Sequence, residues 1–229
     1  MIIKILTSRL SGHIEVPASK SSMQRACAAA LLMHGVAEII NAGRSDDDIA
    51  TIKIIKQLGA DITHTPDGGL IIRGVNGMVS PSGHEIDCGE SGLGIRMFTP
   101  VMALSDRAVR ITGSGSLRNR PMDFFEVVLP QLGVSVQSNN GKVPFTVKGP
   151  LVPADIHIDG SMSSQYLTGL LLAYSVAATT DVTITVHDLK SRPYIDLTLD
   201  VMRKFGMRVP ENRDYTAFYF RGEKEVMAE

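Results

Sequence analysis

The segment DIATIKIIKQLG, residues 48–59, decides the fold because altered copies of it occur twice more in the chain. Each copy has apolar residues at helical spacing, ends in glycine, and is followed by two short strand-like segments and a basic residue before a second glycine. The other copies are RPMDFFEVVLPQLG (120–133) and RPYIDLTLDVMRKFG (192–206). Their final glycines, Gly59, Gly133 and Gly206, lie 74 and 73 residues apart, which is typical of an internal repeat.

A second shared pattern precedes each copy. It is a short strand, a helix start rich in serine or glycine, an apolar helix and another strand. The helix starts read SKSSMQRA from Ser19, GESGLGIR from Gly89 and GSMSSQYL from Gly160. We expect the strands before them at 13–16, 84–87 and 155–158, and the strands after the helices at 37–40, 108–112 and 181–186.

The sequence therefore predicts an α+β fold of three βαβαββ repeats. They span about 12–75, 83–149 and 154–222. One such unit cannot bury its apolar faces alone, whereas three around a common axis can enclose a core. We predict pseudo-threefold symmetry, with the helices inside and the sheets outside.

Proline and glycine refine the ends of the predicted elements. Pro121 and Pro193 suit a first helical turn, where a missing N–H is tolerated. The glycines that end the three copies suit the left-handed position after a helix. Pro130 predicts a kink or an early stop in the second copy. The turn-rich segments 66–69 and 139–141 predict strand connections.

Composition narrows the class of protein. The 229 residues carry 23 basic and 24 acidic side chains, a net charge of −1, so no basic surface for nucleic acid is expected. No apolar run approaches 18 residues, which predicts a cytoplasmic protein without a membrane span. Cys27 and Cys88 are expected to be reduced structural thiols. The six histidines lack ligand spacing and no nucleotide-binding motif occurs, so neither a metal nor a cofactor is predicted.

Polar residues gather where the three repeats bring equivalent ends together. They lie at the starts of the first helices and in the loops before the second helices: Lys20, Ser21, Arg25, Ser91, Gly92, Arg96, Ser163, Ser164, Gln165, Asp46, Arg120, Ser191, Arg192 and Tyr194. Helix starts offer free N–H donors and a positive dipole end, which suit phosphate or carboxylate. We therefore expect a pocket for a small anion, although no nucleophile with a neighbouring base is visible.

Simpler roles compete for several of these residues. Serines at helix starts are often N-caps, and the acidic cluster 46–48 is explained by capping as well. Arg96 could pair with Glu90, and Gly92 could serve packing. The coincidence of anion-binding residues at three related helix starts favours a shared site.

Five motifs resemble those of the EPSP synthase family of enolpyruvyl transferases. They are PASKSSMQR (17–25), GESGLGIRMF (89–98), SLRNRPM (116–122), SSQYLTGLLL (163–172) and SRPYIDLTLDVM (191–202). They occur in the family's order and span nearly the whole chain. The family fold has two domains of three βαβαββ units each, in agreement with the repeat.

The resemblance implies transfer of the carboxyvinyl group of phosphoenolpyruvate to the 5-hydroxyl of 3-phosphoshikimate, with release of phosphate, on the shikimate pathway to chorismate and the aromatic amino acids. By position, it implies these 3-phosphoshikimate ligands: Lys20, Ser21, Arg25, Ser163, Ser164, Gln165, Ser191 and Tyr194. For phosphoenolpyruvate it implies Lys20, Gly92, Arg120 and Gln165. Lys20 would lie between both substrates and act in catalysis, while Asp46 and Arg96 would support the site.

The chain departs from the family pattern in sequence and in length. Glu90, Leu93 and Met97 stand where the family often has Asn, Thr and Pro, which leaves the response to glyphosate open, while Gly92 favours sensitivity. We also expect the family's second domain, which supplies the acidic base, to be missing from this chain. Residues 1–15 would partly belong to that domain and 16–229 would form the first. We expect this chain to be a truncated part of a protein that is monomeric at full length. Alone it should bind phosphoshikimate weakly and be inactive, because half a cleft cannot close.

Three other functions are weighed against this one. The sister enzyme that acts on UDP-N-acetylglucosamine normally carries a cysteine in the region 113–120, where this chain has none. An RNA 3′-phosphate cyclase would need a basic face and a reactive histidine element. A non-catalytic anion-binding module would bind phosphoshikimate without turnover even when the missing domain is added.

Overall fold

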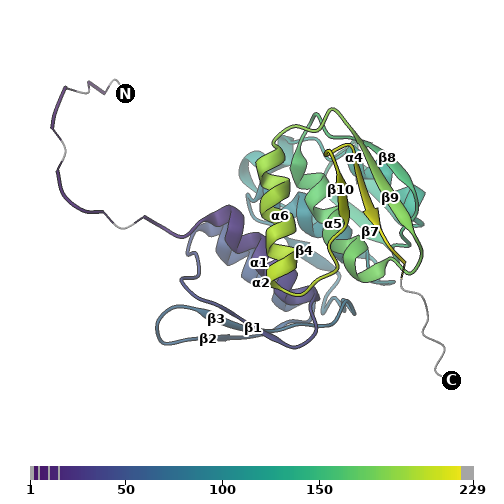
Figure 1. Cartoon of the computed structure of the whole chain (residues 1–229), viewed down its shortest axis with the longest axis horizontal. Coiled ribbons are helices and arrows are strands. Elements are labelled where there is room, and N and C mark those ends of the chain that lie inside the picture. Colours follow the sequence, from purple (N-terminus) through teal and green to yellow (C-terminus); the bar gives the residue numbers. More distant parts are fainter. Residues whose placement is uncertain (1–2, 5, 10, 15, 223–229) are drawn as a thin grey trace.

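Three small sheets surround a set of central helices in the computed structural model (Figure 1), which describes residues 3–4, 6–9, 11–14 and 16–222. Each sheet belongs to one of the predicted repeats, and its strands follow one another along the chain. The mixed α/β architecture predicted from the repeats is confirmed.

The first unit forms a three-stranded antiparallel sheet in the order β1-β3-β2. Its elements are α1 (Lys20–Leu32), β1 (Val36–Ile39), α2 (Asp46–Gln57), β2 (Asp61–His64) and β3 (Leu70–Arg73). In the register of β1 and β3, Val36 lies opposite Arg73 and Ile39 opposite Leu70. The turn at 66–69 connects β2 to β3, as predicted.

The second unit forms a four-stranded sheet in the order β4-β5-β7-β6, in which β4 runs parallel to β5. Its elements are β4 (Glu85–Asp87), α3 (Gly92–Met102), β5 (Val109–Thr112), the 3-10 helix η1 (Gly115–Asn119), α4 (Phe124–Val128), the 3-10 helix η2 (Leu129–Leu132), β6 (Ser135–Asn139) and β7 (Lys142–Lys148). A register shift between Gln137 and Asn139 marks an irregularity in the β6–β7 pair.

The third unit repeats this arrangement, with sheet order β8-β9-β11-β10 and β8 parallel to β9. Its elements are β8 (Ile156–Asp159), α5 (Ser164–Ala177), β9 (Val182–His187), α6 (Arg192–Lys204), β10 (Glu211–Arg213) and β11 (Ala217–Phe220). The matching topology of the second and third units supports the pseudo-threefold relation.

The first unit lacks the strand predicted at 13–16. His13, Ile14 and Val16 adopt no strand, and Glu15 lies outside the described residues. Ile14 and Val16 are 82% and 72% exposed, in a segment that runs away from the body of the protein (Figure 1). An extended segment needs a neighbouring strand to satisfy its backbone, and this one has none among the described residues, so the prediction is wrong there.

The core lies where α1, α3 and α5 pack against one another. Leu31, Phe98 and Leu171, one from each helix, are fully buried. Gly169 allows α5 to approach α3 closely, because a Cβ at that position would lie 2.5 Å from the carbonyl oxygen of Met97. The strands cover this core from outside, with buried residues alternating with exposed ones as in Val109–Thr112. The predicted placement of helices inside and sheets outside is confirmed.

The predicted helix ends are confirmed except at the start of α4. Gly59, Gly133 and Gly206 all have positive φ, at 110°, 76° and 65°. Pro193 lies in the first turn of α6, as expected. Pro121 precedes α4, which begins only at Phe124, so the prediction for Pro121 is wrong.

The predicted effect of Pro130 is confirmed. The helix α4 stops at Val128 and the chain continues as the 3-10 helix η2. Proline cannot donate the next helical hydrogen bond, and a tighter 3-10 turn accommodates it. Within the described ranges no helix is long and apolar enough to cross a membrane.

Candidate functional site

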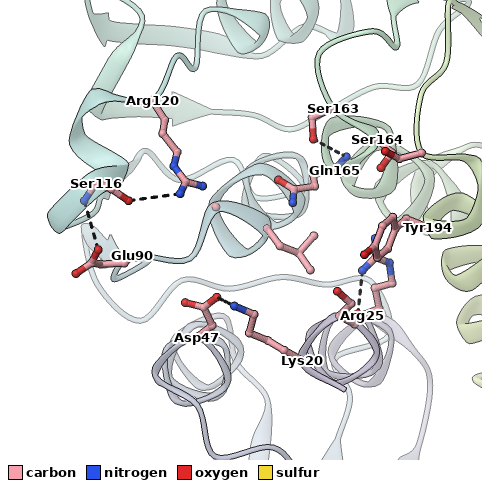
Figure 2. Close-up of a pocket in the computed structure, with 14 residues that line it drawn as sticks. Lys20, Arg25, Asp47, Glu90, Ser116, Arg120, Ser163, Ser164, Gln165 and Tyr194 are labelled. Carbon is pink, nitrogen blue, oxygen red and sulfur yellow. Dashed lines mark hydrogen bonds and ion pairs between the residues drawn. The ribbon is translucent and has the colours of Figure 1, made fainter. Parts of the chain in front are cut away.

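A pocket of about 500 Å³ lies at the N-terminal ends of α1, α3 and α5 (Figure 2). All three units contribute to its wall. It is lined by Lys20, Ser21, Arg25, Asp47, Glu90, Gly92, Leu93, Ser116, Arg120, Ser163, Ser164, Gln165, Ser191 and Tyr194. Ten of these residues were predicted from the sequence as ligands of one or both substrates.

Some predicted residues lie outside the pocket. Asp46, which we expected to support the site, does not line it, whereas its neighbour Asp47 does. Arg96 lies behind the wall, where it donates to Gln165. Asp47 and Ser116 were missed: an acidic residue in a helix start is usually explained by capping, and Ser116 lies in a loop whose conformation the sequence does not reveal.

Arg25 is a buried cation without an acidic partner. Its side chain is 1% exposed, and the described part of the chain places no carboxylate in ion-pair contact with it. Nε donates to Thr198 Oγ1 at 2.9 Å, and Nη1 donates to the carbonyl oxygen of Ser21 at 2.9 Å. Burial lowers the pKa of Arg25 to about 10, and the neighbouring Tyr194 offsets part of that effect. Buried charges are normally paired, so this guanidinium is suited to an anionic ligand.

Lys20 lies at the mouth of the pocket and is paired with Asp47. Its Nζ lies 2.7 Å from Asp47 Oδ2, across the gap between α1 and α2 (Figure 2). The lysine side chain is 54% exposed and the aspartate side chain is 19% exposed. An exposed pair of this kind contributes little to stability, so it restrains the ammonium group more than it stabilises the fold.

Arg120 reaches the pocket from the loop that follows η1. Its Nη2 donates to Ser116 Oγ at 3.4 Å, and the Ser116 N–H donates to Glu90 Oε2 at 3.3 Å. Gly92 makes room for the guanidinium, because a Cβ there would lie 2.3 Å from Arg120 Nη1. A side chain at position 92 would therefore displace the guanidinium of Arg120.

Arg96 orients Gln165 from behind the pocket wall. Its Nη1 donates to Gln165 Oε1 at 3.0 Å, and its guanidinium lies 5.2 Å from the centre of the Tyr166 ring. Because the oxygen of the amide accepts this bond, the amide nitrogen of Gln165 is left as a donor for the pocket. The alternative pairing of Arg96 with Glu90 is not found in the described residues.

Some serines at the helix starts act as N-caps, and others line the pocket. Ser19 and Ser91 cap α1 and α3, accepting from Ser22 N at 3.4 Å and Gly94 N at 3.0 Å. Ser21 is therefore not needed as a cap. Ser163 caps α5 by accepting from Gln165 N at 3.2 Å, and it also lines the pocket.

Ser191 differs from the other cap residues. It precedes α6 with φ 57° and ψ 42°, and its side chain makes no capping bond. A serine in the left-handed region is strained, which is typical of residues that the surrounding structure holds in place for function. Its hydroxyl is free to face the pocket that the residue lines.

The cysteines take no part in the pocket. Cys27 and Cys88 are free, fully buried thiols, as predicted. Burial raises the pKa of Cys27 to about 12 and raises that of Cys88 further. Across the described ranges no group of three or more His, Cys, Asp or Glu side chains is arranged to hold a metal ion.

A family model described as EPSP synthase (3-phosphoshikimate 1-carboxyvinyltransferase) matches residues 6–229. The chain belongs to the EPSP synthase family. Among its relatives, the 3-phosphoshikimate 1-carboxyvinyltransferases of Clostridium novyi and Methanocorpusculum labreanum are 35% and 36% identical over 97% and 93% of this chain. These matches cover 53% and 51% of the relatives, so the chain spans about half the length of the curated relatives it matches.

Solved structures show the same fold as this EPSP synthase family member. An EPSP synthase from Acinetobacter baumannii superposes with a TM-score of 0.78 at 23% identity, covering 93% of this chain and 47% of that one. An enolpyruvyl transferase from Streptomyces tendae gives a TM-score of 0.66 at 17% identity, covering 94% and 49%.

The three residues that depart from the pattern of the EPSP synthase family differ in their distance from the pocket. Glu90 and Leu93 line the pocket, where Glu90 accepts from the loop that carries Arg120. Met97 is fully buried in α3, away from the pocket, in contact with α5. Only the first two departures therefore alter the surface that a ligand would meet.

Proposed function

We propose that this chain binds 3-phosphoshikimate as part of an enzyme that transfers the carboxyvinyl group of phosphoenolpyruvate to its 5-hydroxyl. The observation that carries the proposal is the buried guanidinium of Arg25, which pairs with no carboxylate of the described residues and lies in a pocket lined by serines from all three units. Family membership supports the reaction, and the relatives of known name are transferases of this kind.

The polar groups suit a substrate with an anionic group and several hydroxyls. Arg25 would bind an anionic group of phosphoshikimate, and Ser21, Ser163, Ser164 and Ser191 would donate hydroxyl hydrogens to it. Each charge-assisted hydrogen bond in a site without water contributes about 1.5–3 kcal/mol. Several of them offset the cost of ordering a small dianion.

The opposite side of the pocket suits phosphoenolpyruvate. Arg120 would bind its carboxylate or phosphate, next to the backbone at Gly92, and the amide nitrogen of Gln165 would donate from the wall. Lys20 would lie between the two substrates, where an ammonium group stabilises negative charge that develops in the transition state. Its pairing with Asp47 gives it a defined position from which to act.

The remaining parts of the enzyme would come from outside this chain. We propose that a second domain supplies the general base and further cationic ligands, that residues 1–15 partly belong to that domain, and that the whole protein is a cytoplasmic monomer without nucleic-acid or membrane partners. Closure of two domains would exclude water and strengthen the electrostatic contacts. The 229-residue chain alone would bind substrate weakly and turn nothing over.

Two related functions fit less well. The loop that would carry a cysteine in the enzyme acting on UDP-N-acetylglucosamine has none between Gly113 and Arg120, and it contributes Ser116 to the pocket instead. A non-catalytic anion-binding module would not need Lys20 beside a second anion site at Arg120.

Calorimetric titration of 3-phosphoshikimate tests the proposal. The chain is expected to bind it, Arg25→Ala to abolish binding, and Arg110→Ala to leave it unchanged, because Arg110 pairs with Glu85 on the outer face of the second sheet. Absence of binding by both this chain and the full-length gene product would contradict the proposal. Binding without turnover by the full-length protein would favour the non-catalytic module.

A further inference from the structure

Three helices meet behind the pocket at a buried cluster of polar side chains. Arg25 comes from α1, Thr168 from α5 and Thr198 from α6. Each is 1% exposed or less. Neither threonine lines the pocket. In the sequence, the spacing of Thr198 is that of a core position in a helix.

Thr198 connects the members of this cluster. Its Oγ1 accepts from Arg25 Nε at 2.9 Å and donates to the carbonyl oxygen of Tyr194 at 2.8 Å. It also lies 3.1 Å from Thr168 Oγ1, which in turn lies 3.1 Å from the carbonyl oxygen of Ser164. The Thr198 hydroxyl therefore contacts two pocket residues directly, Arg25 and Tyr194, and reaches a third, Ser164, through Thr168.

The acceptors that orient Arg25 are neutral. Nε is held by the Thr198 hydroxyl and Nη1 by the carbonyl oxygen of Ser21, and the described residues give Nη2 no hydrogen-bond partner. A carboxylate in the place of Thr198 would orient the guanidinium equally well but would neutralise its charge. A hydroxyl fixes the plane of the guanidinium and leaves both Nη2 and the positive charge for a ligand.

We propose that Thr198 is a positioning residue for the anion pocket, which holds the Arg25 guanidinium in its binding orientation through Nε. This inference rests on the proposed function, since the ligand is the anionic group of phosphoshikimate. Tyr194 adds to the same arrangement, because its ring lies 5.7 Å from the Arg25 guanidinium and its carbonyl group is bound by Thr198 (Figure 2 shows Tyr194 beside Arg25).

The test compares Thr198→Val with Thr198→Ser in this chain. Valine keeps the shape of threonine without the hydroxyl, whereas serine keeps the hydroxyl. Thr99→Val is the matched control, because Thr99 is also fully buried in a helix but donates to Ile95 O, away from Arg25. Two quantities are measured for each variant: hydrogen exchange of the Arg25 Nε–H by NMR in the free protein, and the Kd for 3-phosphoshikimate by calorimetry, with inorganic phosphate as a second probe.

We expect Thr198→Val to lose protection of the Arg25 Nε–H and to weaken binding by about tenfold to a hundredfold, the effect of losing one hydrogen bond to a charged group. Thr198→Ser and Thr99→Val should keep both quantities within about threefold, which corresponds to less than one hydrogen bond. Thermal unfolding shows whether each variant is folded.

Several results would overturn the inference. One is unchanged exchange of the Nε–H in Thr198→Val, which decides the question even if no ligand binds. Another is equal weakening by valine and serine, which would make the role one of packing. Failure of the proposed function is separate: the unmodified chain would then bind neither probe while its Arg25 Nε–H remained protected.

Discussion

Replacing Arg25 by methionine is expected to raise the stability of the free protein while abolishing anion binding. Methionine has nearly the length of the arginine stem and no charge, so it fills the space without leaving a cavity. Most substitutions of a buried side chain destabilise a protein, and the opposite sign would identify a charge that the fold holds for a ligand.

The magnitude follows from the environment of the guanidinium. Burial lowers the pKa of Arg25 to about 10, and at about 1.4 kcal/mol for each pH unit this lowering corresponds to about 3 kcal/mol of destabilisation at neutral pH. Methionine removes this cost but also removes two hydrogen bonds, to Thr198 Oγ1 and Ser21 O, at about 1 kcal/mol each. The net expectation is a gain of about 1 kcal/mol, or about 2–4 °C in Tm for a chain of this size.

Urea and thermal unfolding of the free chain measure this gain, and calorimetry measures the loss of binding. The matched control is Arg208→Met, because Arg208 is half-buried and donates to the carbonyl oxygens of Ser175, Tyr174 and Arg221. That variant should lose about 1–2 kcal/mol, since it leaves acceptors without a donor. A loss of more than about 2 kcal/mol in Arg25→Met would refute the reasoning, because it would mean that the fold itself compensates the buried charge.

Three further outcomes are expected. Gly92→Ala should leave Tm unchanged or raised and keep 3-phosphoshikimate affinity within about threefold, while a crystal structure of the variant should show the Arg120 guanidinium displaced by the new methyl group. Ser191→Gly should relieve the strain of φ 57° and raise the unfolding free energy by about 1 kcal/mol. The same variant should bind 3-phosphoshikimate more weakly in calorimetry. The control Asp188→Gly, at φ 51° outside the pocket, should raise the unfolding free energy without weakening binding. Both buried thiols should resist a thiol reagent in the native protein, as mass spectrometry would show. Burial raises the pKa of Cys27 to about 12, so above about pH 9 this thiol loses its proton in the unfolded state only. The unfolding free energy measured in urea titrations should therefore fall as the pH rises above about 9.

The sequence predicts the repeat and its helix ends because these depend on local chemistry. A glycine after a helix accepts positive φ wherever it occurs, so Gly59, Gly133 and Gly206 mark three true helix ends. Pro130 removes a hydrogen-bond donor in any environment, and α4 stops just before it. The place of the pocket could be anticipated for a related reason, since the repeat brings the three equivalent helix starts together.

Features that depend on neighbours far along the chain could not be predicted. The segment 13–16 alternates like a strand, but nothing among the described residues pairs with it. Arg96 has Glu90 close in sequence, yet it binds Gln165, 69 residues away. Thr198 looks like a core position of α6, and only the packing of α6 on α1 brings its hydroxyl to Arg25, 173 residues away.

All three units supply walls of the pocket, so a bound ligand should change the opening motions of each unit. If any one unit opens by local unfolding, a wall is lost and the ligand must leave, so binding opposes every such opening by the same free energy. Bound ligand should therefore slow amide exchange in the remote sheets as well as at the helix starts. The affinity for the ligand would then depend on all three units being folded at the same time.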